Sequence, residues 1–449
     1  MRVLFTSLAL LAACGGHTTN GNDSGDSGDA TRPDACVGLE CQVKACSGAG
    51  QTPTTLTGVV YAPNGTLPLF GADVYIPRDA PGPLAEGAEC SRCQDLPGFP
   101  IAQTKTNEKG EFTLQNVPAG ASVPVVISLG KWRRQITVSN VAECAPTALT
   151  AEQTRLPKTK AEGDIPKIAI TTGNADSLEC LIRKLGIDDT EITNDQGTGR
   201  VNLYKGNGVG QFKAGYPGGS GQSLAAAKPF WSSVDKLKAY DIVIFSCEGQ
   251  QNPGTKPQEA LDAVKAYADF GGRVFLSHWH NIWVEGSTQG GGNQKPAVWP
   301  EIATWTNSPT TFGGSGDHDV IDQTANPKGA QFAAWMTNVM GSTTPGEIPI
   351  QSQTGKQTCE AVNPIKAERW TYWKDNNTDY TQNFQFTTPN EAAADARCGK
   401  VVFSDMHVSG GPQAGDYPDS CGGSLALSPQ EKALAFMFFD IATCISIIP

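Results

Sequence analysis

The hydrophobic pattern of this chain changes near Pro166, and the change divides the sequence into two kinds of fold. Over residues 46–150, short apolar runs alternate with polar residues and are separated by turns such as Pro63-Asn64-Gly65. This period of two is typical of a small β-sandwich. Residues 166–449 instead contain apolar strands that alternate with helical patterns, which indicates a doubly wound α/β sheet buried on both faces. The sequence therefore predicts a multidomain chain with a polar linker over 151–165.

The α/β part carries clear boundary signals. Ser428-Pro429-Gln430-Glu431 is a capping box with proline at the first helical position, and Thr255 with Gln258 offers a second one. Gly271-Gly272 is expected to end the helix that follows Gln258. The apolar strands are expected over residues 167–172, 242–246, 274–277 and 401–404, and a further helix over 328–340.

Four ordered motifs in the sandwich region resemble one known module. They are Gly58-x-Val60, Gly71-Ala72-x-Val74, Thr106-x-x-x-Gly110-x-Phe112 and Val117-Pro118-x-Gly120. Over about 95 residues this pattern is similar to the carboxypeptidase regulatory-like (transthyretin-like, Ig-type sandwich) domain. The resemblance implies a non-catalytic accessory module of exported proteins. Residues 131–134 (Lys-Trp-Arg-Arg) are interpreted as a solvated strand face, with a ligand patch as the alternative.

The first fourteen residues have the layout of a secretory signal. Arg2 precedes an apolar run over 3–13 that is too short to span a bilayer, and polar low-complexity sequence follows. The ending Leu11-Ala12-Ala13-Cys14 resembles a bacterial lipobox, which implies lipidation of Cys14 and a flexible polar tether over 15–45. The alternative is an ordinary signal with a chance cysteine. We therefore expect a lipid-anchored cell-envelope protein, on the outer membrane or the periplasmic or extracellular face.

Composition excludes some partners and favours disulfides. The net charge is −11 without a basic stripe, which argues against nucleic acid, and no later stretch reaches eighteen apolar residues. Twelve cysteines follow Cys14, an even number suited to disulfides in an exported chain. Cys90-x-x-Cys93 could also indicate a zinc or redox site, but no second close ligand pair lies nearby. The connectivity is open.

Histidines follow two of the predicted strands. His278 and His280 come after the strand at 274–277, and His407 follows the late strand together with Asp405. Ligands in such sheets bind beyond the carboxyl ends of the strands. These side chains are therefore candidates for a divalent metal site or an acid/base pair, with Asp405 orienting a histidine. The alternative is that they cap strands or satisfy core hydrogen bonds.

Other candidate groups are weaker. His318 lies in a polar stretch that reads as a loop, although it could supply another ligand. An aromatic platform for sugars is possible, but large aromatic residues more often pack in a core. The tryptophans concerned are Trp279, Trp283, Trp299 and Trp305.

The same segments carry a second resemblance. The strand 240–245, the following helix and Gly271-Gly272 with the strand to His278 are similar to class I glutamine-amidotransferase-like folds of flavodoxin-like architecture. There the glycine pair and strand lead to a nucleophilic cysteine, a position held here by His278, as in the ThuA-like branch. The resemblance extends to Lys400–Phe403 with His407, and it implies that amidotransferase chemistry is lost. Cys247 is either a displaced nucleophile or, as the even count favours, a disulfide partner.

Two functions follow as expectations. The first is a cell-envelope binding or interaction protein for carbohydrate or another surface polymer. The second is a ThuA-like hydrolase or metal-dependent enzyme that uses His278, His280 and His407. The proximity of these side chains in the fold distinguishes the two.

Overall fold

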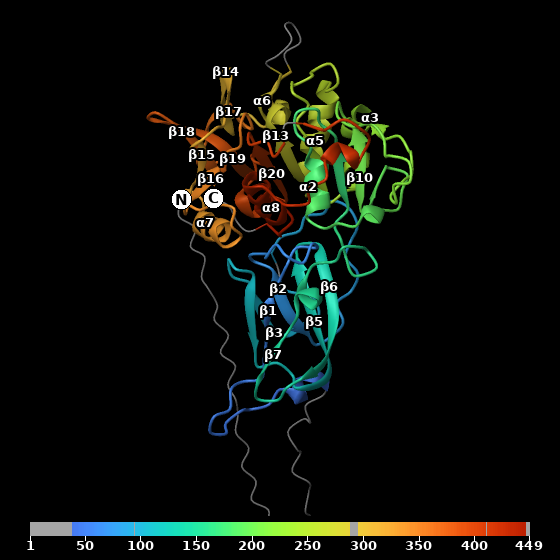
Figure 1. The fold of residues 1–449 in the computed structure, drawn as a ribbon, viewed down its shortest axis with the longest axis vertical. Helices are drawn as coiled ribbons and strands as arrows, with labels where there is room; N and C mark the ends of the chain where they lie inside the picture. Colours follow the sequence, from blue (N-terminus) through green and yellow to red (C-terminus); the bar gives the residue numbers. More distant parts are fainter. Residues whose placement is uncertain (1–37, 94, 288–294, 410, 446–449) are drawn as a thin grey trace, which may run out of the picture. The chain divides into compact units, whose positions relative to one another are not determined.

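The computed structural model describes residues 38–93, 95–287, 295–409 and 411–445, and residues 38–449 form one compact unit (Figure 1). The predicted signal, its Cys14 and the tether up to residue 37 lie outside the described residues. The 3-10 helix η1 (Gly38–Gln42) follows, and the Gln42 carbonyl accepts a hydrogen bond from the amide of Ala119 at 2.9 Å. No helix among the described residues is long and apolar enough to cross a bilayer.

Residues 55–148 form two antiparallel-rich sheets. In β4 every second residue is buried, so the alternating pattern directs one face inward. The disulfide Cys46–Cys144 joins the segment before the first of these strands to the turn before the last one. The first sheet has the order β4 (Glu111–Gln115), β1 (Thr55–Val59), β7 (Pro146–Ala148), and the second β3 (Pro100–Lys105), β2 (Asp73–Pro77), β5 (Gly120–Leu129), β6 (Trp132–Val141).

The second part is built on one large mixed sheet. Its parallel strands have the order β11 (Ala225–Ala226), β10 (Val201–Lys205), β8 (Ile168–Thr171), β12 (Ile242–Phe245), β13 (Arg273–Ser277), β20 (Gly399–Ser404), with β9 (Ile192–Thr193) beside β10. The sheet continues antiparallel through β19 (Thr378–Thr388), β18 (Glu368–Asp375), β15 (His318–Ile321) and β16 (Glu347–Pro349). The strands β14 (Ala303–Phe312) and β17 (Gly355–Val362) pair separately. The parallel strands β8, β12, β13 and β20 match the expected apolar runs, whereas β9, β10, β11 and the antiparallel extension were not expected from the sequence.

Helices cover both faces of the parallel strands. On one face, α2 (Leu178–Lys184) and α8 (Pro429–Ile441) pack against residues such as Ile170 and Phe275. On the other, α5 (Gln258–Phe270) packs against Val243 and Val274. Alternate residues of each strand thus enter opposite cores. The remaining helices are α1 (Ala151–Thr154), η2 (Asp189–Glu191), α3 (Ala227–Trp231), α4 (Val234–Lys238), η3 (His278–Asn281), α6 (Ile282–Glu285), α7 (Gly329–Asn338), η4 (Ala394–Ala396) and η5 (Asp419–Cys421).

The predicted helix caps have different outcomes. The capping box of Ser428 and Glu431 is present at α8. The one predicted for Thr255 is wrong, because Pro257 is the N-cap of α5 and the Thr255 hydroxyl donates to the Asn252 carbonyl.

The region between the two parts is packed against its neighbours. Helix α1 begins at a capping box made by Thr150 and Gln153. Arg155 is buried and forms ion pairs with Glu152 and Glu162. These contacts hold residues 151–165 in an ordered arrangement.

Disulfides link segments that are far apart in the sequence. Cys90 and Cys93, between β2 and β3, pair with Cys398 and Cys444. The disulfide Cys180–Cys421 lies within the α/β part. The disulfide interpretation of Cys90-x-x-Cys93 is therefore confirmed, and these bonds indicate an extracytoplasmic protein.

One disulfide prediction is wrong. Cys247 and Cys359 are free and buried, although the even number of cysteines favoured a bridge for each. Pairing requires Cα atoms less than about 7 Å apart with suitable directions, and a cysteine count does not contain this geometry. Cys247 is therefore available as a nucleophile or a metal ligand.

Candidate metal centre

Three neighbouring parallel strands carry a cysteine and two histidines to one edge of the sheet. Cys247 follows β12, His278 follows β13 directly and His407 follows β20. The register pairs Phe245 with Leu276 and Ser277 with Ser404, so the three strands end level with one another. The sheet thus places the three side chains together at the carboxyl ends of its strands.

The ligand atoms of these residues lie close together. The Cys247 Sγ atom is 3.6 Å from Nδ1 of His278, and the rings of His278 and His407 have centroids 5.0 Å apart. One candidate ligand atom from each residue lies within 4.8 Å of the other two. His278 has a φ of 41°, a left-handed conformation that is costly for a side chain of this size and typical of functional sites.

The donor set and its spacing suit zinc. Tetrahedral zinc with Zn–S near 2.3 Å and Zn–N near 2.05 Å separates sulfur and nitrogen by about 3.6 Å. The distance between Cys247 and His278 matches that value. The Nε2 atom of His407 is buried and has no hydrogen-bond partner among the described residues, an arrangement that a bound cation would satisfy. One thiolate and two imidazoles favour zinc over the oxygen-seeking calcium and magnesium ions.

Burial keeps all three groups uncharged when no cation is present. It raises the pKa of the Cys247 thiol to about 12 and lowers the pKa of His278 well below its usual value. Burial, followed by the charge of Lys356, lowers the pKa of His407 to about 3. A neutral thiol is a poor nucleophile, so this arrangement does not favour cysteine-based hydrolysis.

Asp176 connects the loops that carry the two histidines. Its carboxylate accepts hydrogen bonds from the hydroxyl of Ser277 at 3.0 Å and from the amides of Val408 and Ser409 at 3.1 Å. The carboxylate is fully buried, and burial raises its pKa to about 7. Asp176 thus fixes the backbone beside both His278 and His407.

Glu179 is a buried residue in the first turn of α2, three residues after Asp176. Its titration makes the free energy of unfolding depend on pH. Burial, with the nearby charge of Asp176, raises the pKa of Glu179 to about 8. Between about pH 5 and pH 8 the unfolded chain loses this proton while the folded chain keeps it, so stability falls as the pH rises. Over this range we expect the free energy of unfolding of Glu179→Gln to fall by about 1.4 kcal/mol less per pH unit than that of the wild type.

Urea unfolding at pH 5.5 and pH 7.5, in the presence of a chelator, measures this difference. The exposed Glu143→Gln variant is the control and should keep the wild-type pH dependence. An unchanged slope in Glu179→Gln would show that Glu179 is ionised in the folded state.

His280 does not join the cluster. Its Nε2 atom is 3.0 Å from the Ser246 carbonyl oxygen, and its Nδ1 accepts a hydrogen bond from the Trp283 indole at 2.9 Å. The chain enters η3 at His278, so the extended backbone needed to place residues 278 and 280 on one face is absent. The ring of His280 stacks on Phe245 instead.

Among the described residues, the Asp405 carboxylate forms its hydrogen bonds with β17 and not with either histidine. Its carboxylate accepts hydrogen bonds from the Thr358 hydroxyl and amide at 2.6 and 2.7 Å and from the Cys359 amide at 3.0 Å. It therefore anchors β17 to the end of β20.

The other candidates have structural contacts. His318 is partly exposed, 3.0 Å from the Gly316 carbonyl and 3.6 Å from Glu347. Trp283 and Trp299 are buried and pack in the core. In the segment 131–134, Lys131 contacts Asp241 at 2.7 Å and Arg133 contacts Asp164 at 2.8 Å, so these basic side chains are used within the fold.

Sequence reasoning considered Cys247 but favoured a disulfide for it, and it missed Lys356. Cys247 ends an apolar strand in the same way as His278, and this shared position was the available signal. Lys356 comes from β17, whose place beside the cluster no sequence pattern indicates. Its charge acts on both His278 and His407.

Comparisons with known proteins give distant likenesses in structure. No protein-family model and no curated protein matches the chain. Solved structures that match include a ThuA-like protein from Bacteroides uniformis, with a TM-score of 0.30 and 11% identity over 61% of this chain and 90% of that one. A cytoplasmic protein from Salmonella typhimurium has a TM-score of 0.32 and 12% identity, over 62% of this chain and 99% of that one.

A third match is a larger enzyme. The beta-galactosidase from Bacillus circulans sp. alkalophilus has a TM-score of 0.26 and 12% identity over 54% of this chain. The match spans 28% of the length of that enzyme. The structural neighbours of the chain thus include a ThuA-like protein at low identity, together with proteins of other kinds.

Proposed function

We propose that the α/β part is a metal-dependent hydrolase of the ThuA-like type, with zinc held by Cys247, His278 and His407. The observation that carries the proposal is the convergence of three ligand atoms within 4.8 Å at the carboxyl edge of the sheet. The parallel order β10-β8-β12-β13-β20 supports a flavodoxin-like architecture, in which this edge is the usual ligand site.

Cys247, His278 and His407 would hold the zinc, and a bound ion would supply Lewis-acid activation of water for hydrolysis of a carbonyl or phosphoryl compound. The chain supplies the rest of the site. Asp176 holds the backbone on both sides of the ligands through Ser277, Val408 and Ser409. Lys356 contributes a positive charge near both histidines, suited to stabilising an anionic transition state.

The cellular setting of the proposal is the cell envelope. The disulfides support an exported protein, and the lipobox-like ending at Cys14 supports a lipid anchor. The substrate class that suits this setting is carbohydrate or another envelope polymer. The sandwich would then act as an accessory module.

A second candidate function is a binding protein in which the metal is structural. The burial of the three ligands favours it, because Cys247 is 0%, His407 3% and His278 5% exposed. Closed zinc sites stabilise folds without catalysis. In that case bound zinc would raise the melting temperature of the protein without supporting hydrolysis.

Both candidates are tested by removing metal with a chelator and restoring zinc. Nitrophenyl acetate, nitrophenyl phosphate and nitrophenyl glycosides serve as substrates. We expect zinc to restore hydrolysis of at least one of them, and His278→Ala to lower the rate at least about 100-fold. His318→Ala is the matched control and should keep the activity. Zinc that raises the melting temperature without any hydrolysis would favour the second candidate and contradict the first.

A further inference from the structure

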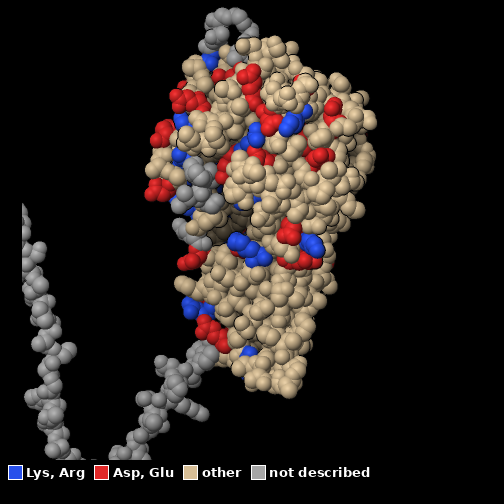
Figure 2. Space-filling view, turned by 90° about the vertical axis from the view of Figure 1, so that its left-hand side faces the viewer, with Lys and Arg blue, Asp and Glu red and all other residues tan. Residues whose placement is uncertain are grey.

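A separate cavity of about 300 Å³ lies between helices α7 and α8 and the strands of the sandwich. Its walls are mainly apolar and include four aromatic residues, Phe70, Trp335, Phe436 and Phe439. Figure 2 shows a hollow with basic side chains at its rim on the face it displays. A cavity of this size with apolar walls and few charged groups is typical of a small-molecule site. It shares no lining residue with the cluster of Cys247, His278 and His407.

The aromatic walls are held in place by the fold. The indole N–H of Trp335 donates to the Pro68 carbonyl at 2.8 Å, which leaves the ring face for packing. Phe436 packs against both Trp335 and Phe70, with ring centroids 5.2 and 6.0 Å away. Because a dry cavity of 150 Å³ holds benzene, this one has room for about a dozen non-hydrogen atoms.

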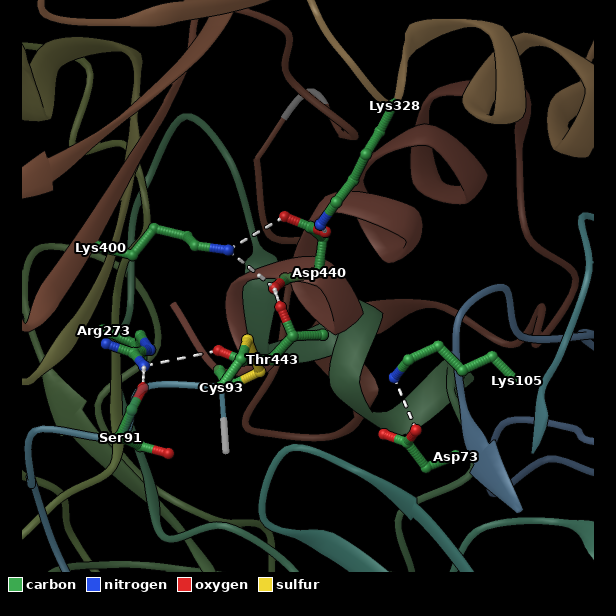
Figure 3. The surroundings of a disulfide bond; sticks show 10 residues. Asp73, Ser91, Cys93, Lys105, Arg273, Lys328, Lys400, Asp440 and Thr443 are labelled. Carbon is green, nitrogen blue, oxygen red and sulfur yellow. Dashed lines mark hydrogen bonds and ion pairs between the residues drawn. A yellow bond between two sulfur atoms is a disulfide. The ribbon is translucent and has the colours of Figure 1, made fainter. Parts of the chain in front are cut away.

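One side of the cavity carries an excess of positive charge. Lys328 and Lys400 both pair with Asp440, and Arg273 lies nearby (Figure 3). Burial opposes ionisation of Asp440, yet the two lysines hold its pKa at about 2. Arg273 donates to carbonyl oxygens, including those of Ser91 and Thr443, and forms no ion pair among the described residues. Two lysines thus share the Asp440 carboxylate, and of these groups Lys328 and Asp440 line the cavity, whereas Lys400 and Arg273 do not.

Other ionisable groups lie near the two lysines. Glu368 faces the same lysines, but burial raises its pKa and its carboxylate accepts a hydrogen bond from Gln385 at 2.7 Å. Lys105 lines the cavity from the sandwich side, with its side chain 66% exposed and paired to Asp73. Because Lys328 and Lys400 share a single carboxylate, an anion beside Lys328 would balance the second positive charge.

We propose that the cavity binds a small organic carboxylate with an aromatic or branched apolar body. The body lies against Trp335 and Phe436, and the carboxylate pairs with Lys328 and Lys105. Gln331 adds a polar contact for a ligand that also carries a hydroxyl or N–H donor, because its Oε1 atom is buried without a partner among the described residues.

Calorimetric titration of the whole protein tests this with three acids, 3-phenylpropionate, 3-phenyllactate and indole-3-acetate, and with the neutral 3-phenylpropanol. We expect at least one acid to bind with a Kd below about 1 mM, and the alcohol to bind at least about tenfold more weakly than its matching acid. Lys328→Met and Lys105→Met should each weaken the acid and leave the alcohol unchanged. Gln331→Trp, which fills the cavity, should abolish both.

Lys109→Met is the control, since Lys109 is an exposed lysine away from the cavity lining. It should bind like the wild type. Equal affinity for acid and alcohol, binding that survives in Gln331→Trp, or no saturable binding of any acid would each overturn the proposal. Unchanged melting temperatures for Lys105→Met and Gln331→Trp exclude unfolding as the cause of any loss.

Discussion

Replacing His407 with alanine is expected to lower the affinity of the protein for zinc by at least about 100-fold. Loss of a group that only orients a metal ligand costs 10- to 100-fold, and His407 would be a ligand itself. Its Nε2 atom is buried without a partner among the described residues, so the truncation removes no other hydrogen bond of that atom. Competition with a chromogenic chelator at fixed pH measures the affinity.

The two free cysteines provide a matched pair of variants for the same measurement. Cys247 and Cys359 are both free and fully buried, but only Cys247 belongs to the cluster. Cys247→Ala should therefore lose zinc, while Cys359→Ala should keep it at the wild-type affinity. Equal zinc affinities in Cys247→Ala, His407→Ala and the wild type would show that any bound metal lies elsewhere.

The second large effect concerns the two disulfides that join the sandwich to the α/β part. Cys90–Cys398 and Cys93–Cys444 span 308 and 351 residues of sequence. While one bridge remains, breaking the other opens a loop of about 50 residues, made by the segments 90–93 and 398–444, which corresponds to about 4 kcal/mol. Breaking both releases the long loop as well, and the total rises to about 10 kcal/mol.

The measurement is the free energy of urea unfolding for Cys93→Ser/Cys444→Ser, Cys90→Ser/Cys398→Ser and the fourfold variant. The fourfold variant should lose more stability than the sum of the two double variants, because each bridge shortens the loop closed by the other. Strict additivity would contradict this picture. A variant lacking Cys46 and Cys144 is the control, since that bridge lies within the sandwich and does not join it to the α/β part.

The sequence predicted those elements whose own hydrophobic pattern identifies them without knowledge of a partner element. The strands β8, β12, β13 and β20 are buried along their whole length and read as continuous apolar runs. The antiparallel extension was missed because strands such as β18 and β19 bury polar side chains. Asn383, for example, is fully buried and donates to the Thr371 hydroxyl at 2.6 Å. Such contacts depend on a partner strand and leave no period in the sequence.

The candidate site was predicted in part for a similar reason. His278 and His407 were expected at one edge of the sheet because both follow parallel strands, and the carboxyl ends of parallel strands meet at the same edge. His280 was grouped with them on the assumption of extended backbone, whereas η3 turns its ring into the core. Cys247 was assigned to a disulfide by counting, which has no access to the distance between two sulfur atoms.

X-ray absorption at the zinc edge of the zinc-loaded protein tests the metal centre most directly. The expected first shell contains one sulfur at about 2.3 Å and two imidazole nitrogens at about 2.0–2.1 Å, completed by a light atom from water. The sulfur contribution should vanish in Cys247→Ala and persist in Cys359→Ala. A first shell without sulfur, or one unchanged by Cys247→Ala, would contradict a zinc centre built from Cys247, His278 and His407.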